Sequence, residues 1–197
     1  MTDHRLTALS PLDGRYADKC ADLASLFSEA ALIGYRVRIE AGWLRQLASS
    51  GHFPALGTLP PPLASRLDAL AAGVEESAVR RVKEIERETN HDVKAVEYFV
   101  REQLTASGAR PAQLEFVHFA CTSEDINNLS YAMMLADARA GVLLPLIGEL
   151  ADRLARLAHD HAATAMLSRT HGQPASPTTL GKEAANFVTR FRRAAAS

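Results

Sequence analysis

The feature that most constrains the fold of this chain is an unbroken heptad pattern of apolar residues that follows Ser123. Apolar residues recur there at alternating steps of three and four, at Ile126, Leu129, Met133, Ala136, Ala140, Leu143, Ile147, Leu150, Leu154 and Leu157. This spacing places them along one seam of a helix and is typical of left-handed helical bundles. At the usual rise per residue, such a helix is about 50 Å long.

Pro145 lies inside this pattern but does not have to end the helix. A proline ring in a helix presses on the carbonyl four residues earlier, and that residue here is Gly141, where crowding is least. We therefore expect a kink at this point. The composition also favours helices, because 35 Ala and 25 Leu stand against only 15 Val plus Ile.

Capping residues, glycines and prolines divide the rest of the chain into further helices. The expected helices cover residues 28–50, a short stretch ending at 73, 75–88, 93 to about 107 with Asp92 as its cap, and a bundle helix that starts at Ser176-Pro177 after a loop over 162–175. No strand-like alternation is long enough to build a sheet. The predicted fold is all-α, with a small helical domain over residues 1–110 and the first long helices of a central bundle over residues 111–197.

Charge and cysteine content exclude several classes of protein. The chain has 22 Lys plus Arg and 23 Asp plus Glu, so its net charge of -1 gives no reason to expect binding to nucleic acid or to an anionic membrane. The uncharged run over residues 46–65 contains four prolines and is expected to be a loop, not a membrane span. Residues 1–16 contain no apolar segment typical of a secretory signal, so a cytoplasmic location is expected. Cys20 and Cys121 are too far apart for a metal-binding motif and are expected to be reduced.

Three polar clusters lie at the ends of expected helices: Asn90-His91-Asp92, Thr122-Ser123, and the run Ser168 to Pro174 around His171. Free N–H groups and hydroxyls at a helix N-terminus form a natural anion site, with Ser123 here the expected cap. An imidazole such as that of His171 can donate or accept a proton near neutral pH. Each cluster, taken alone, is better explained as an ordinary cap or turn.

Arg15 and Tyr16 follow the turn-forming sequence Ser-Pro-Leu-Asp-Gly. A guanidinium and a phenol on such a turn could bind a phosphate group together. The same residues could also belong to an ordered N-terminal arm, so both interpretations remain open from the residues alone.

Taken together and in order, these clusters resemble the adenylosuccinate lyase family, in its longer bacterial form, within the fumarase and aspartase superfamily. The matching stretches are residues 10–16, 89–99, 117–128 and 168–175. The sequences Thr-Ser-Glu-Asp and His-Gly-Gln-Pro distinguish this family from fumarases and argininosuccinate lyases. The resemblance therefore disfavours another lyase of the superfamily.

The resemblance implies cleavage of adenylosuccinate to AMP and fumarate, and of the related aminoimidazole succinylocarboxamide ribotide, without a cofactor or metal. His171 would be the general acid that protonates the departing amine. The implied substrate-binding residues are Arg15, Tyr16, Asn90, His91, Asp92, Thr122 and Ser123. The resemblance also implies a small-molecule nucleotide as partner, neither nucleic acid nor membrane, and assembly into a homotetramer.

One departure from the family pattern is large. The family places its catalytic base, a serine, on a loop with the signature Gly-Ser-Ser-x-Met-Pro, which this sequence lacks. The last apolar helix pattern also reaches Ser197 without a stop signal, so we expect an N-terminal portion of a longer enzyme that is inactive alone. Because the heptads fit an assembly role equally well, the alternative hypothesis is a non-catalytic helical interaction module.

Overall fold

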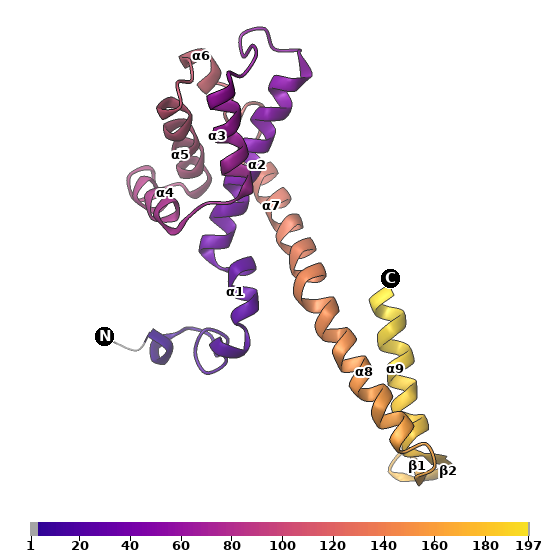
Figure 1. The fold of residues 1–197 in the computed structure, drawn as a ribbon. Helices are drawn as coiled ribbons and strands as arrows, with labels where there is room; N and C mark the ends of the chain where they lie inside the picture. Colours follow the sequence, from indigo (N-terminus) through magenta and orange to yellow (C-terminus); the bar gives the residue numbers. More distant parts are fainter. Residues whose placement is uncertain (1–3, 197) are drawn as a thin grey trace. The chain divides into compact units, whose positions relative to one another are not determined.

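The computed structural model describes residues 4–196, which cluster into two compact units that divide between Ala136 and Asp137 (Figure 1). Helices make up nearly all of its regular structure, so the predicted helical class is confirmed, with one small two-stranded sheet in addition. The predicted domain boundary between residues 110 and 111 stays a prediction. The expectation about the end of the chain concerns Ser197, which lies outside the described residues.

The first unit is built from short 3-10 turns and a series of helices. Its elements are η1 (His4–Thr7), η2 (Ala17–Lys19), α1 (Ala21–Phe27), α2 (Glu29–Ser50), α3 (Pro61–Ala72), α4 (Glu76–Thr89), α5 (Asp92–Ala106), α6 (Pro111–Leu114) and most of α7 (Ser123–Ala138). The side chain of Ser28 caps α2 by accepting a hydrogen bond from the N–H of Ala31 at 3.2 Å. Gly51 ends the helix in the left-handed conformation. The helix predicted over residues 28–50 is thereby confirmed.

The core of the first unit forms where α2 packs against α3 and α5, and where α4 packs against α5. Leucines and valines from all four helices are almost completely buried there, among them Val37, Leu44, Leu67, Val82 and Val96. Burying each such side chain contributes about 1.5–3 kcal/mol, so this unit has a core of its own. The loop predicted over residues 46–65 is wrong at both ends, because α2 extends to Ser50 and α3 begins at Pro61. Proline suits the first turn of a helix because its missing N–H needs no partner there.

The heptad region is helical without a break from Ser123 to Asp160, over 38 residues. It comprises α7, a π-helical segment η3 (Arg139–Leu143) and α8 (Leu144–Asp160). The N–H of Leu144 donates to the carbonyl of Arg139, five residues earlier, just before Pro145. Pro145 has no N–H to donate within the helix. The wider hydrogen bonding of the π-helical segment accommodates this missing donor, so the helix continues through Pro145 as expected. Among the described residues, this is the one helix long and apolar enough to cross a membrane by length and composition.

The second unit pairs α8 with α9 (Leu180–Ala196) and joins them through a β-hairpin (Figure 1). Strands β1 (Ala165–Thr170) and β2 (Gln173–Thr179) run antiparallel, with a register shift between Leu167 and Arg169. Gly181 lies so close to α8 that a Cβ atom there would be 2.4 Å from the carbonyl oxygen of Ala158. The close approach of α9 to α8 therefore depends on this glycine.

Two predictions for this region are wrong. Residues 162–175 were expected to form a loop, and Ser176-Pro177 to start the last helix, but both stretches contribute to the hairpin. Prolines are tolerated in β2 because each strand of a two-stranded sheet has one unpaired edge. The cap of α9 is instead Thr179, whose hydroxyl oxygen accepts a hydrogen bond from the N–H of Lys182 at 3.1 Å.

Candidate functional site

The corner between α4 and α5 is shaped by Asn90 and His91. Asn90 adopts the left-handed conformation (φ 51°), and its N–H donates to the carbonyl of Glu86 at 2.8 Å, which ends α4. The Nδ1 atom of His91 accepts a hydrogen bond from the N–H of Lys94 at 3.2 Å. His91 is therefore the cap of α5, and the prediction that Asp92 caps it is wrong, because Asp92 is already the first helical residue.

Asp92 is held by a buried arginine from α2. The Nη2 atom of Arg36 donates to Asp92 Oδ2 at 2.7 Å, and its Nε atom donates to the side-chain oxygen of Asn127 on α7 at 2.9 Å. Burial acts to raise the pKa of Asp92, but the N–H of Val93 and the Arg36 guanidinium outweigh it, so this pKa lies below its ordinary value. Arg36 thus links the start of α5 to the first turns of α7 around a carboxylate that stays ionised.

The carboxylate of Asp125 accepts hydrogen bonds at the start of α7. Both the N–H and the hydroxyl of Thr122 donate to Asp125 Oδ2, at 2.7 and 2.8 Å. These bonds, the backbone bond first, hold the pKa of Asp125 below its ordinary value. Because α7 already includes Ser123, the cap position belongs to Thr122 and not, as predicted, to Ser123. Thr122 is exposed, but its N–H and hydroxyl are both bonded to Asp125.

His118 is bonded to a buried glutamate, a contact that the sequence analysis did not predict. Its Nδ1 atom lies 2.6 Å from Oε1 of Glu40, a residue with 0% exposure on α2. The hydrogen bond to Glu40 outweighs the effect of burial and raises the pKa of His118 above its ordinary value. His118 also has a positive φ of 62°, so it occupies a sharp turn of the chain before α7.

Arg36 and Glu40 lie one helical turn apart on α2 and are its two buried charged residues. They stand among core residues such as Ile33, Val37 and Ala41, where an apolar residue is expected. That conflict with the apolar pattern was the one signal in the sequence that could have identified them. Through these two side chains, α2 holds both the 90–92 corner and the segment that leads into Thr122 and Ser123.

Arg15 and Tyr16 lie on a separate turn of the first unit. The N–H of Gly14 donates to the carbonyl of Ser10 at 3.1 Å, and the N–H of Tyr16 donates to that of Pro11 at 2.9 Å. The guanidinium carbon of Arg15 lies 5.7 Å from the centre of the Tyr16 ring. Both side chains are exposed, so the predicted pair is formed on a turn as expected, with its polar groups open to a ligand.

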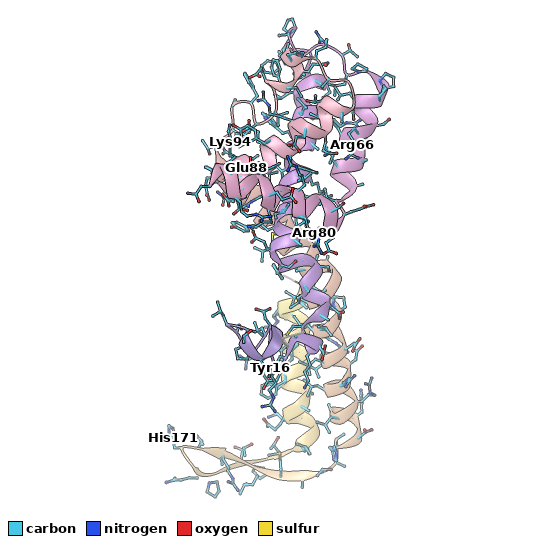
Figure 2. All side chains as sticks on the ribbon, turned by 90° about the vertical axis from the view of Figure 1, so that its left-hand side faces the viewer. Tyr16, Arg66, Arg80, Glu88, Lys94 and His171 are labelled. Carbon is cyan, nitrogen blue, oxygen red and sulfur yellow. The ribbon has the colours of Figure 1, made fainter. Side chains whose placement is uncertain are left out.

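His171 belongs to the second unit and lies at the turn between β1 and β2 (Figure 2). His171 and Gly172 both have positive φ angles, 51° and 75°. Two successive residues with positive φ are typical of the tightest hairpin turns. The imidazole is exposed at this turn. Within the first unit, Arg36 links the 90–92 corner with α7, while Arg15 and Tyr16 lie on a separate turn.

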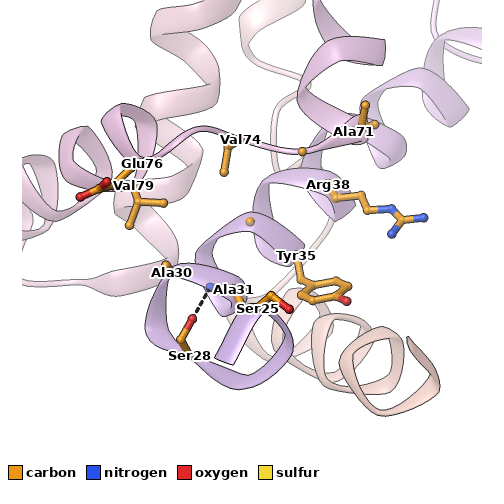
Figure 3. Close-up of a pocket in the computed structure, with 13 residues that line it drawn as sticks. Ser25, Ser28, Ala30, Ala31, Tyr35, Arg38, Ala71, Val74, Glu76 and Val79 are labelled. Carbon is orange, nitrogen blue, oxygen red and sulfur yellow. Dashed lines mark hydrogen bonds between the residues drawn. The ribbon is translucent and has the colours of Figure 1, made fainter. Parts of the chain in front are cut away.

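A cavity of about 450 Å³ lies beside the N-terminal half of α2, next to the connection between α3 and α4 (Figure 3). Polar side chains on its wall include Ser25, Tyr35, Arg38 and Glu76. None of the predicted site residues lines it. Among residues 4–196, no group of three His, Cys, Asp or Glu side chains is placed to hold a metal ion.

Comparison with known proteins identifies a family. A sequence profile of the family described as Lyase matches residues 14–196. Over 188 residues, the chain is 51% identical to an adenylosuccinate lyase of Haemophilus influenzae and 48% identical to one of Escherichia coli. Each of these matches covers 95% of this chain and 41% of the relative, so the chain spans about two-fifths of the length of these relatives.

The fold is also found in a solved structure. The crystal structure of a fumarate lyase from Mesorhizobium matches with a TM-score of 0.67 at 26% identity, covering 89% of this chain and 38% of the other. The match extends over nearly all of the chain, in agreement with the predicted first helices of a superfamily bundle.

Proposed function

Because the chain belongs to the lyase family, we propose that it provides part of an adenylosuccinate lyase, a carbon–nitrogen lyase that releases fumarate from adenylosuccinate and leaves AMP. The observation that carries this proposal is the 51% identity, over 95% of the chain, to an enzyme of that name. Since that match covers 41% of the relative, the proposed activity belongs to a protein that also contains the remainder. The related succinylocarboxamide ribotide is proposed as a second substrate.

The first unit provides the proposed binding surface. Arg15 and Tyr16 are exposed on one turn and offer a guanidinium and a phenol to the phosphate of the nucleotide. We propose that Asn90, His91 and Asp92, at the corner between α4 and α5, contribute to the same site. No metal or cofactor is needed for these contacts.

Thr122 and Ser123 are proposed to hold a carboxylate of the substrate at the start of α7. In the described structure, the N–H and hydroxyl of Thr122 both donate to the carboxylate of Asp125, so a substrate carboxylate would take the place of Asp125 at these two donors. Charge builds on the substrate carboxylate next to the carbon that loses a proton, and donors at a helix N-terminus stabilise that charge.

His171 on the hairpin turn is proposed as the general acid. The elimination removes a proton from the carbon beside the carboxylate and breaks the carbon–nitrogen bond, while an imidazolium gives a proton to the departing amine. The products are then fumarate and AMP. The base is not among the residues assigned here, and the chain lacks the serine loop of the family. We therefore expect the chain alone to be inactive.

The apolar seam supports a proposal of self-assembly. Leu129, Leu143, Leu150 and Leu157 are all at least 40% exposed, although they occupy the positions that face partner helices in a bundle. We propose that this seam packs in a homotetramer, and that the protein acts in the cytoplasm on a small-molecule substrate. The same exposed seam favours the second candidate function, a helical interaction module without catalysis.

The deciding experiment compares the chain alone with a chimaera in which it replaces the aligned stretch of the Haemophilus influenzae relative. Conversion of adenylosuccinate is followed by the absorbance of the nucleotide, with the unmodified relative as the control. We expect turnover by the chimaera and none by the chain alone. A chimaera that folds and assembles as the relative does, yet shows no turnover, would contradict the proposed lyase and favour the interaction module.

A further inference from the structure

The burial of Glu40 carries a cost in stability. Its exposure is 0%, one carboxylate oxygen is bonded to His118, and the other, Oε2, has no hydrogen-bond partner in the described structure. Removing a carboxylate from water is costly, and replacing a buried ion pair by apolar side chains is often neutral or stabilising. A buried pair with one unsatisfied oxygen therefore requires another explanation, and its position suggests one.

The hydrogen bond to Glu40 determines which ring nitrogen of His118 carries a proton, and it also orients the ring. A carboxylate accepts hydrogen bonds, so the Nδ1 atom at 2.6 Å carries the proton. The second ring nitrogen, Nε2, makes no hydrogen bond to the residues that the structure describes. The side chain is 17% exposed, and a proton on Nε2 has no acceptor among the described residues.

His118 lies just before the start of α7 at Thr122 and Ser123. The N–H of Cys121 donates to the carbonyl of His118 at 3.2 Å, which closes the turn that leads directly into Thr122. The charge of His118 also acts on Asp125, the carboxylate that Thr122 binds. His118 is therefore close enough to the start of α7 to act electrostatically on Asp125.

We propose that Glu40 is a positioning residue, which holds His118 protonated and fixed so that the ring presents a cationic donor beside Thr122 and Ser123. This inference rests on the proposed function, because it assigns Glu40 to the surface that binds the anionic substrate. Glu40 does not touch the substrate and acts through the orientation and charge of His118.

The charged groups around His118 determine its pH response. Glu40 faces it from α2, Glu97 and Lys94 act on it from α5, and Asp125 lies at the start of α7. Glu97 raises and Lys94 lowers the pKa of His118, but Glu40 has the largest effect. Glu97 is itself bonded to Lys94 at 2.8 Å, so its carboxylate is partly neutralised.

Glu97 thereby offers a matched control. Both glutamates are buried, at 0% and 4% exposure, and both can be changed to glutamine with little change in shape, but only Glu40 is bonded to His118. In the chain as it stands, NMR titration of the His118 ring is expected to show a lower midpoint in E40Q and a much smaller change in E97Q. Equal midpoints in E40Q and the unchanged chain would overturn the proposal.

The same variants in the chimaera test the consequence for substrate. E40Q is expected to lower kcat/KM for adenylosuccinate by about tenfold at pH 8 and by less at pH 6, because low pH restores the charge of His118. E40D is expected to recover part of the loss, and E97Q to stay close to the parent. A pH-independent loss in E40Q, or a loss of equal size in E97Q, would indicate a structural role alone and overturn the proposal.

The titration of the chain and the kinetics of the chimaera distinguish a failure of this inference from a failure of the proposed function. A chimaera without turnover contradicts the lyase proposal, yet the titration of the chain still decides whether Glu40 controls His118. Conversely, an active chimaera in which E40Q keeps the parent kcat/KM at every pH overturns the positioning role while the lyase proposal stands.

Discussion

The two units of the chain bury different kinds of side chain. The first buries large side chains between α2, α3, α4 and α5 and also buries three charged residues, Arg36, Glu40 and Glu97. In the second, the buried residues of α8 and α9 are small: Ala151, Gly181, Ala184 and Val188. Its large apolar side chains, such as Leu146, Leu150 and Phe187, are exposed instead.

This difference determines what holds the polar side chains of each unit in place. In the first unit, Arg36 and Glu40 are held by surrounding core and in turn fix Asp92 and His118. In the second unit, His171 is held by the backbone of a tight turn and is exposed. The proposed binding surface is thus preorganised by packing in one unit, whereas the proposed acid in the other depends on a hairpin turn.

The largest expected effect is the loss of a buried apolar side chain, which we compare with the loss of an exposed one. Leu44 is 1% exposed in the first core, so Leu44→Ala is expected to cost about 2–5 kcal/mol of unfolding free energy. Leu150 is 45% exposed on α8, and Leu150→Ala is expected to change the unfolding free energy by about 0.5 kcal/mol or less. Urea unfolding of the chain measures both. A comparable loss in Leu150→Ala would show that the seam is packed in solution, as in a self-associated chain.

The next effect concerns the proposed division of roles. In the chimaera, His171→Gln is expected to lower turnover by about a hundredfold or more while nucleotide binding stays within a few-fold, because an amide cannot act as the acid. Arg15→Ala is expected mainly to weaken binding, since a phosphate contact acts on ground and transition states alike. Steady-state kinetics separates the two. If His171→Gln instead raised KM with turnover intact, His171 would be a binding residue and His91 the candidate acid.

A smaller effect tests the close helix contact of the second unit. Gly181→Ala places a Cβ atom 2.4 Å from the carbonyl oxygen of Ala158, so α9 must move away from α8, at a cost of about 1–3 kcal/mol. Gly148 on α8 has no atom within 4 Å of such a Cβ, so Gly148→Ala is the control and is expected to stabilise the helix by up to about 1 kcal/mol. Amide hydrogen exchange should show faster exchange in α9 for the first variant alone. Unchanged protection of α9 would mean that the contact with α8 is looser than the structure indicates.

Local signals in the sequence were sufficient where the structure depends on local bonds. The helix over residues 28–50 was predicted because Ser28 and Gly51 mark its ends, and both act as expected. The same kind of signal failed at Ser176-Pro177, because a serine followed by proline fits a strand edge as well as a helix start. Nothing in the local sequence distinguishes these two conformations.

The buried charges were missed for a different reason. Glu40 and His118 are 78 residues apart in sequence, and Arg36 is 56 residues from Asp92. Helical periodicity assigns a face to each residue but cannot identify a partner on another helix. The site residues named by resemblance were therefore recognised as clusters, while the side chains that hold them in place became visible only with the packing of α2.

The smallest expected effect is a pH dependence confined to the first unit. The pKa of His118 is raised in the folded chain, chiefly by its hydrogen bond to Glu40, so the pair stabilises the fold fully below the ordinary histidine pKa of 6.5. That contribution is lost as the pH rises through the raised pKa, whereas Asp92, whose pKa is lowered, loses its contribution only on acidification below 3.8. Urea unfolding of the chain should therefore show a contribution from this pair that declines as the pH rises above 6.5, and E40Q should remove most of that slope. Hydrogen exchange in α9, corrected for the intrinsic effect of pH, should show no such decline, because His118 belongs to the other unit. An equal slope in E40Q would assign the pH dependence to groups other than the Glu40–His118 pair.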